Sequence, residues 1–469
     1  MNRRSTAWLI VVILPLLFLP KINLFNFAEG ESAGLRVDDI FLLIFSFILF
    51  WIRFSLTFQF TQLEKDLALI MGLSIISLGI NKFFLFNGIL TTQASLPYAV
   101  RIFEYFLFFY VGFWSVRHFE TKKVVWTFVI INALIICLQR AGLIGGFFLG
   151  QYHSNMSGRV TGIAAFPTEM GVLLNFLFAY LIFTKDKIEL SAFWPDPFRR
   201  FIASTGIFWL FLLFGILTIL TGTRAALVAL PILLIARLWS LGGAKRKTII
   251  LLPLLVLILI PLMKNTEELF LRSQSLFSWH NLDVIGEVWN RIDISGHLDP
   301  NGLYIVEASE NQDVSWLMRL NKWIFVTKSF LYHPETWLFG LGPGTSGSGL
   351  DGGLLRIAVE GGILGSIAYA FFFRHLAAIS LTSRWLVVTL LLNMIFVDAH
   401  LAYKIMSLFF FLTGAEMGVR QESLQEDNEC NLSWDHQKAS LSPAFQRFSL
   451  GASRQHGRRD SGQRQDHEQ

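Results

Sequence analysis

The sequence has few charged residues and almost no cysteine. Asp, Glu, Lys and Arg make up 16% of its 469 residues, whereas soluble domains carry about 25%. The two cysteines lie apart, Cys137 in an apolar run and Cys430 in a polar segment, so they supply neither a disulfide framework nor a metal-binding cluster. These shortages exclude a soluble enzyme, a disordered chain and a secreted disulfide scaffold.

Hydrophobic residues are abundant instead, at 53% of the chain, and they gather in long runs. Runs of about 18 or more apolar residues cross a hydrocarbon core of ~30 Å as helices. The sequence therefore predicts an all-α polytopic membrane protein with about 12 transmembrane helices, several of them short. The predicted spans are 7–20, 39–52, 66–80, 98–116, 124–139, 168–184, 201–220, 225–239, 248–263, 353–373, 385–399 and 402–418.

The Lys and Arg residues behind the net charge of +5 stand in short turns between these runs. When the spans are counted from the N-terminus, the basic turns fall on one side, which the positive-inside rule makes cytoplasmic. Both termini are then expected to be cytoplasmic. No nucleic-acid partner is expected, because the basic residues form no stripe that could follow a phosphate backbone.

The spans divide the chain into four parts. We predict a bundle of about nine spans in residues 1–263, a large periplasmic loop with short amphipathic helices in 264–352, and about three more spans in 353–420. Residues 421–469 are polar and lack apolar periodicity, so we predict a disordered cytoplasmic tail.

The predicted loop contains one clear helical pattern. Apolar residues recur at helical spacing over 315–332, with Arg319 and Lys322 on the polar side. This helix either lies on the membrane surface with solvated charges or acts as a lid that directs Arg319 toward an anionic headgroup. The following segment is rich in glycines, including Gly342 and Gly344, which allow a backbone to approach a ligand closely.

Charged residues at the ends of apolar runs are costly and need a reason. Arg224 follows the turn Thr221-Gly222-Thr223, where a helix start offers free N–H groups to an anion. An arginine there can bind phosphate oxygens with two hydrogen bonds. An arginine that merely anchors the turn at the interface is an equally good interpretation.

Acidic residues stand at the outer ends of two other spans. Glu169, in a predicted first helical turn, either complements the helix dipole or accepts a proton. Asp351 precedes Arg356 and Glu360, and these last two are four residues apart on a helix. We expect Arg356 and Glu360 to form a structural ion pair.

Five short motifs occur along the chain in a particular order. They are Arg36-Val37-Asp38-Asp39, Arg159-x-Thr161-Gly162 with Pro167-Thr168-Glu169, Thr221-Gly222-Thr223-Arg224, Arg319 with His333-Pro334 and Gly340-x-Gly342-Pro343-Gly344, and Glu360-Gly361-Gly362-Ile363-Leu364-Gly365. In content and order, residues 36–400 resemble the O-antigen polymerase and ligase family of bacterial envelope glycosyltransferases. Ligases of this family carry His-Asn where this chain has Asp351-Gly352, so the resemblance favours a polymerase.

The resemblance implies an enzyme of the bacterial inner membrane that polymerises polyprenyl-diphosphate-linked oligosaccharide repeat units into O-antigen or exopolysaccharide on the periplasmic face. The implied glycosyl transfer inverts configuration and needs neither a metal nor a cofactor. The implied partners are the lipid-linked oligosaccharide and the bilayer, and the family's chemistry leaves room for a chain-length regulator.

The same resemblance, joined to the chemistry of the side chains, implies roles for particular residues. Arg224 and Arg319 are expected to neutralise the charge that develops on the diphosphate, and Asp351 or Glu169 to accept the proton of the acceptor hydroxyl. The expected substrate-binding residues are Arg159, Arg356, Lys322, Gly342 and Gly344.

Two other functions remain open at this point. An O-antigen ligase would share the chemistry at the donor and differ only in its acceptor. A flippase or transporter for the same lipid-linked sugar would also need many spans, although transporters often bind their substrate near the bilayer midplane, whereas these charges gather at one end of the spans.

Overall fold

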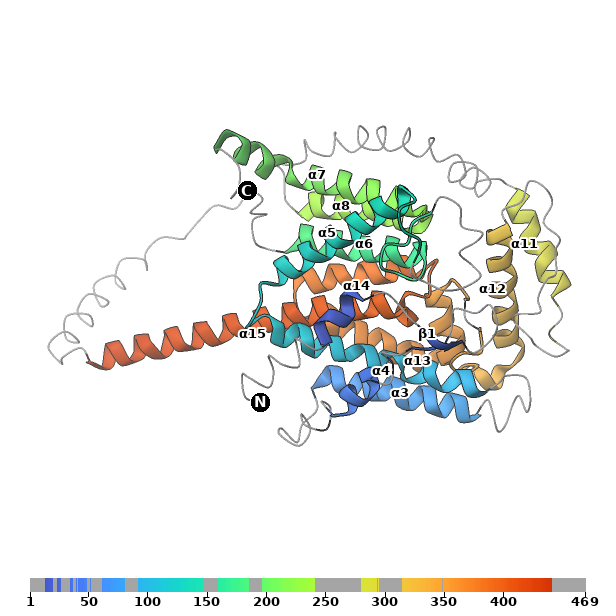
Figure 1. Cartoon of the computed structure of the whole chain (residues 1–469). Helices are drawn as coiled ribbons and strands as arrows, with labels where there is room; N and C mark the ends of the chain where they lie inside the picture. The colour runs from blue at the N-terminus through green and yellow to red at the C-terminus, as the bar shows by residue number, and fades with distance from the viewer. Residues whose placement is uncertain are drawn as a thin grey trace, which may run out of the picture. The chain divides into compact units, whose positions relative to one another are not determined.

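The computed structural model of the chain is predominantly helical (Figure 1). It describes residues 13–19, 23–26, 34–36, 39, 41–48, 51, 61–80, 92–146, 159–184, 196–240, 280–292, 294, 314–347 and 349–440. The chain divides into two compact units, Met1–Gly418 and Val419–Gln469. One short antiparallel pair joins β1 (Asn23–Asn26) to β2 (Gly34–Arg36).

The helices follow the apolar runs of the sequence. They are α3 (Gln62–Ile80), α4 (Thr92–Ser115), α5 (Thr121–Arg140), α6 (Pro167–Phe183), α7 (Asp196–Thr221), α8 (Arg224–Ser240), α11 (His280–Arg291), α12 (Val314–Tyr332), α13 (Gly353–Ala377), α14 (Leu381–Met394) and α15 (Tyr403–Ser440). The short 3-10 helices η5 (Pro334–Thr336) and η6 (Ala399–Leu401) lie in two of the connections.

Within the described residues, three helices are long and apolar enough to cross a membrane: Ser95–Ser115, Thr121–Arg140 and Gly353–Ala377. Shorter apolar helices cover Pro167–Phe183, Gly206–Thr221 and Leu381–Met394. The prediction of a helical chain with helices that could span a membrane is confirmed at this coarser level, apart from the short strand pair. The predicted span 248–263 lies outside the described residues, and the total of about 12 spans stays a prediction.

Helix α6 occupies the centre of the main hydrophobic core. Its side chains are buried without interruption from Met170 to Phe183, because α14, α7 and α8 all pack against it. A helix that is apolar on every face belongs in such a position. The core is rich in contacts between aromatic rings, among them the stacked pair of Phe183 and Trp385 at 4.6 Å between ring centroids.

A second, smaller core lies under α12. Leu317, Leu320 and Ile324 of this helix are buried, as the helical spacing over 315–332 predicts, and they pack with Val284 and Val288 of α11. The predicted helix over 315–332 is therefore confirmed as α12. In Figure 1, α12 crosses the direction of α3 and α13.

Helix α15 continues beyond residue 420 to Ser440. Gln421, Glu422, Leu424 and Gln425 have high helix propensity, and extending an existing helix avoids the cost of starting a new one. Residues 441–469 lie outside the described residues, and the disordered cytoplasmic tail stays a prediction.

Two distant parts of the chain meet at the start of α15. The Nζ atom of Lys404 donates hydrogen bonds to the carbonyl oxygens of Leu16 at 2.7 Å and Leu17 at 3.2 Å. Tyr403 donates a third hydrogen bond from its hydroxyl to Leu16. Residues 13–18 are helical, so the buried ammonium satisfies carbonyl groups at a helix C-terminus.

Helix α13 contains a sharp break at Gly362, whose backbone lies at φ 63° and ψ −162°. An unbroken helix would pair Ile363 N–H with the Val359 carbonyl, and Leu364 N–H with the Glu360 carbonyl. Ile363 and Leu364 instead donate to the carbonyls of Trp337 and Leu338 at 2.9 and 3.1 Å.

The segment before α13 supplies the other half of this exchange. Leu341 N–H donates to the Val359 carbonyl at 2.7 Å, and Gly342 N–H donates to the Glu360 carbonyl at 3.1 Å. The break thus exchanges two helical hydrogen bonds for four that attach residues 337–342 to α13.

Helix α3 lies beside α13 and runs in the opposite direction. Asp66 near the start of α3 pairs with His375 near the end of α13 at 2.5 Å. Near the other end of α3, the Ser77 hydroxyl lies 3.5 Å from the Gly340 carbonyl oxygen and 3.4 Å from that of Glu360. These contacts hold α13 and the attached segment against α3.

Substitution of Gly362 tests this arrangement. A Cβ atom at Gly362 would lie 2.4 Å from the Gly340 nitrogen, and its positive φ disfavours any other residue, so Gly362→Ala should destabilise the protein by about 1–3 kcal/mol. Gly365→Ala in the same helix is the matched control, since its Cβ would meet no atom within 4 Å. Thermal unfolding in detergent should show a lower midpoint for Gly362→Ala alone, and equal midpoints would contradict the interpretation of the break.

Candidate functional site

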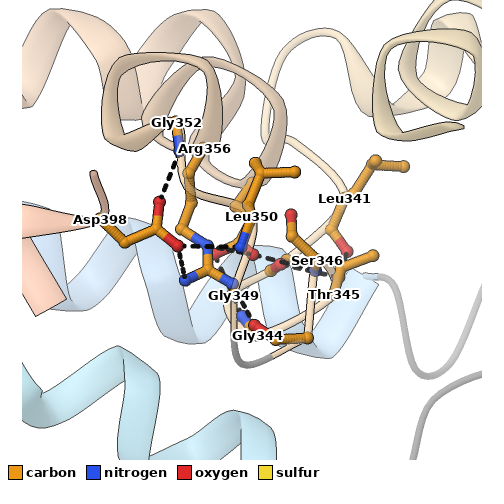
Figure 2. A network of polar contacts seen from close by, with 12 residues as sticks. Leu341, Gly344, Thr345, Ser346, Gly349, Leu350, Gly352, Arg356 and Asp398 are labelled. Atoms are coloured by element: carbon orange, nitrogen blue, oxygen red, sulfur yellow. Dashed lines mark hydrogen bonds and ion pairs between the residues drawn. The ribbon is translucent and has the colours of Figure 1, made fainter. Parts of the chain in front are cut away.

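The side chain of Arg356 forms the centre of a polar network beside the glycine-rich loop of residues 340–352 (Figure 2). It is 1% exposed. Its Nε atom pairs with Glu360 Oε1 at 3.1 Å, and its Nη1 atom pairs with Asp398 Oδ2 at 2.9 Å. Its Nη2 atom donates to the carbonyl of Gly347. The expected pair between Arg356 and Glu360 is confirmed.

The carboxylate of Glu360 also holds the first half of the loop. It accepts hydrogen bonds from Gly344 N–H at 3.1 Å and from Ser346 N–H at 3.0 Å. Gly342 and Gly344 both have positive φ, at 90° and 81°. The two glycines that we expected to approach a substrate therefore position the loop backbone against α13.

Asp398 holds the second half of the loop, and the sequence analysis missed it. Its carboxylate accepts hydrogen bonds from the N–H groups of Leu350, Asp351 and Gly352 at 3.0, 3.2 and 3.1 Å. Three backbone donors and one guanidinium stabilise this largely buried negative charge. Its position at the end of the apolar run 385–399 was the available signal, since a carboxylate there needs a partner.

The loop places Asp351 directly against α12. Arg319 Nε lies 2.9 Å from Asp351 Oδ2, and Lys322 Nζ donates to the Gly349 carbonyl at 2.9 Å. Trp323 adds a hydrogen bond from its indole N–H to the Leu350 carbonyl at 2.8 Å. Three successive contacts of one helix thus fix residues 349–351.

Asp351 combines a constrained backbone with an accessible carboxylate. Its φ is 54°, a conformation that Asp tolerates better than most side chains. The side chains of Arg319 and Asp351 are 24% and 41% exposed, in contrast to the buried Arg356. Of these three expected site residues, Arg319 and Asp351 can therefore meet a ligand without prior rearrangement of the core.

A second group of expected site residues surrounds the turn between α7 and α8. Arg159 donates from Nε to the Thr221 carbonyl at 3.2 Å and from Nη2 to the Gly222 carbonyl at 3.4 Å. Arg224 begins α8. The Thr223 hydroxyl donates to the Pro167 carbonyl at 2.8 Å, which ties this turn to the start of α6.

Glu169 lies in the first turn of α6, as expected. Its Oε2 atom accepts a hydrogen bond from Ala165 N–H at 3.1 Å, so the carboxylate caps the loop that precedes its own helix. The structure thus brings Arg319 and Asp351 together and places Arg159 against the turn that leads to Arg224. That both groups bind one diphosphate stays a prediction.

His400 of η6 lies close to the network. It is 3% exposed, and its Nδ1 atom has no hydrogen-bond partner among the described residues. Burial, together with the positive charge of Arg356, lowers the pKa of the His400 imidazole to about 3. The imidazole is therefore neutral near pH 7 and adds no charge beside Arg356.

The arrangement offers a cation and a carboxylate at the surface of a rigid loop. Such a pair can bind an anionic group through the guanidinium and accept a proton at the carboxylate. In the described part of the chain, no group of three or more His, Cys, Asp or Glu side chains is placed to hold a metal ion. Comparison of the chain with models of known protein families and with curated proteins gives no match.

Removal of the Asp398 carboxylate should destabilise the loop. In Asp398→Ala the buried Arg356 retains Glu360 as its one carboxylate partner in the described network, and the three N–H groups of 350–352 lose their acceptor, so the cost should be about 3–5 kcal/mol. Glu287→Ala removes one partner of the exposed pair between Arg291 and Glu287 and should change stability little. Equal thermal midpoints for the two variants in detergent would refute the role of Asp398.

The pKa of His400 gives a pH dependence with a definite sign. Between about pH 3 and the unfolded value of about 6.5, the unfolded chain binds a proton that the folded chain does not. Stability should therefore fall as the pH drops below about 6.5, and the fall should be smaller in His400→Gln. Thermal midpoints at about pH 7.5 and about pH 5.5 measure this difference, and parallel falls in the two proteins would contradict it.

Proposed function

We propose that this protein is a membrane glycosyltransferase that polymerises polyprenyl-diphosphate-linked oligosaccharide repeat units. In this proposal the chain lies in the bacterial inner membrane with about 12 spans and cytoplasmic termini, and its site faces the periplasm. The resemblance of residues 36–400 to the O-antigen polymerase and ligase family supplies the substrate class, and the geometry around Asp351 supplies the chemistry.

The observation that carries the proposal is the pair formed by Arg319 and Asp351. Its two charged atoms are 2.9 Å apart, and both side chains are partly exposed. Asp351 stands two residues before Gly353, where the candidate span α13 begins. A diphosphate attached to a lipid in the bilayer would reach a guanidinium at this level, while its sugar would extend toward the polar side.

Binding of the diphosphate gives each member of the pair a separate task. The phosphate oxygens compete with Asp351 for Arg319, and the released carboxylate becomes free to accept a proton. Arg319 is always charged, so it stabilises the negative charge that grows on the leaving group. Lys322, Arg159 and Arg224 are the further cations of this proposal.

The transfer is a single displacement. The acceptor hydroxyl oxygen forms a bond to the anomeric carbon, and the bond from that carbon to the diphosphate oxygen breaks, with its electron pair leaving on the diphosphate. The hydroxyl proton passes to Asp351, with Glu169 as the alternative base. Attack opposite the leaving group inverts the configuration, and the step requires no nucleotide sugar and no metal.

Arg356 has a different task in this proposal from the one expected at first. Its guanidinium already contacts two carboxylates and one carbonyl, and it is buried. It therefore supports the loop that carries Asp351, as do Gly342 and Gly344, and it does not contact the substrate.

Purified protein incubated with a lipid-diphosphate oligosaccharide tests the proposal. We expect ladders of lengthened product from the wild type. Arg319→Ala should reduce the rate by about 10²–10³-fold, and Asp351→Asn by about 10²–10⁴-fold. Arg291→Ala is the matched control, because Arg291 belongs to an exposed pair on α11 in the same predicted loop, and it should keep the wild-type rate.

Thermal midpoints separate lost chemistry from lost folding in these variants. Asn tolerates positive φ as Asp does, so Asp351→Asn should unfold close to the wild-type temperature. Normal product ladders from both Arg319→Ala and Asp351→Asn would refute the assignment.

The acceptor and the fate of the lipid-linked sugar distinguish the two alternatives. A ligase would transfer a finished glycan to a different lipid or protein acceptor and would not lengthen the donor. A transporter would bind the lipid-linked oligosaccharide without changing it. The replacement of the ligase His-Asn by Asp351-Gly352 favours the polymerase.

A further inference from the structure

Large apolar side chains are exposed where α12 ends and the chain turns toward the glycine-rich loop. Leu331 and Tyr332 close the helix, and Trp337 and Leu338 follow η5. Tyr332 is 63% exposed and Trp337 is 44% exposed. These four side chains are called the 331–338 surface below.

The 331–338 surface is rigidly attached to the helices around it. The indole N–H of Trp337 donates to the Phe330 carbonyl at 2.8 Å, so the side chain folds back over α12. The carbonyls of Trp337 and Leu338 accept hydrogen bonds from Ile363 and Leu364 at the break in α13. A surface held by these bonds cannot turn its apolar groups inward.

Helix α3 indicates the level at which this surface lies. Ser77 contacts the Gly340 carbonyl and stands three residues before Ile80, where α3 ends, so Gly340 lies within about 5 Å of that end along the axis. The surface therefore lies at the level of one end of the predicted span 66–80.

The exposed apolar surface continues directly onto a candidate membrane span. Ile363, Ile367 and Phe371 are all exposed on α13 and recur every four residues, so they form one stripe along the helix. Ile363 is also the residue that donates to the Trp337 carbonyl. The stripe and the 331–338 surface thus form one continuous apolar face.

We propose that the 331–338 surface inserts into the boundary between headgroups and acyl chains in the leaflet at the N-terminal end of α13. Its partner is bilayer lipid. Tyr and Trp favour this boundary because their rings are apolar and their polar groups can still reach water or carbonyls. The adjacent His333 and Glu335 pair with each other at 3.1 Å, and their side chains are 31% and 44% exposed, as expected for the polar border of an interfacial segment.

This contact would fix the level of α12 relative to the bilayer. Arg319 is 12 residues before Leu331 on the same helix, which corresponds to about 18 Å. Figure 1 shows α12 crossing the direction of α13, so an anchored C-terminal end lets the helix lie along the surface. The proposal does not rest on the proposed enzymatic function.

Spin labels on the full chain in liposomes test the proposal. The background carries Cys137→Ser and Cys430→Ser, which remove the two native cysteines. Single cysteines then replace Leu338, Tyr332, Ile367 and Glu287, and each receives a nitroxide. Liposomes of phosphatidylethanolamine and phosphatidylglycerol hold the protein, and collisions with oxygen and with a polar nickel complex report the depth of each label.

The label at 287 stands at an exposed position of α11. Relative to it, we expect the labels at 338 and 332 to collide more often with oxygen and less often with the nickel complex. They should lie shallower than the label at 367, on the stripe of α13. Collision rates at 338 and 332 that equal those at 287 would place the surface in water and overturn the proposal. Immobile labels shielded from both reagents would indicate a protein partner or a second copy of the chain, and would overturn it as well. The label at 332 decides the question if Leu338→Cys fails to fold.

Discussion

The break at Gly362 is the constraint on which the site depends. A helix that crosses a bilayer normally satisfies its own backbone, and unpaired N–H and carbonyl groups at that depth are costly. The break releases two donors and two acceptors, and residues 337–342 satisfy all four. Residues 337–342 therefore supply the hydrogen-bond partners that α13 lacks at its break, and α13 supplies partners to these residues in return. Helix α12 in turn contacts residues 349–351 of the loop. The hydrogen bonds at the break therefore also help to position Arg319 on α12.

The buried charges extend this constraint from backbone to side chains. Glu360 and Asp398 each accept loop N–H groups and each pair with Arg356. A single guanidinium thus pairs with two carboxylates, and the same two carboxylates define the course of the loop. Burial makes an unpaired charge expensive, so the network favours one loop conformation over its competitors. The network of Arg356, Glu360 and Asp398 thus positions the accessible pair of Arg319 and Asp351 and takes no part in the proposed reaction itself.

Local patterns in the sequence predicted the features that depend on neighbours along the chain. Apolar runs marked α3 to α8 and α13 to α15, helical spacing marked α12, and a separation of four residues marked the pair of Arg356 and Glu360. Asp398 was missed because it meets Arg356 across 42 residues of sequence, and no local spacing encodes such a contact. The helical part of 421–440 was missed because the sequence was judged there by apolar pattern alone, although its residues have high helix propensity. Whether Arg224 and Arg319 act on one ligand depends on a contact of the same long-range kind.

The hydrogen bonds of Lys404 have a consequence for biogenesis. They join Lys404 to Leu16, which stands 388 positions earlier, so they can form only after Lys404 has left the ribosome. Early segments of a chain fold while later ones are still being made. The carbonyls of Leu16 and Leu17 must therefore find other partners, such as water, lipid headgroups or the insertion machinery, until Lys404 arrives. Chains that stop before Lys404 leave that helix end without its cation.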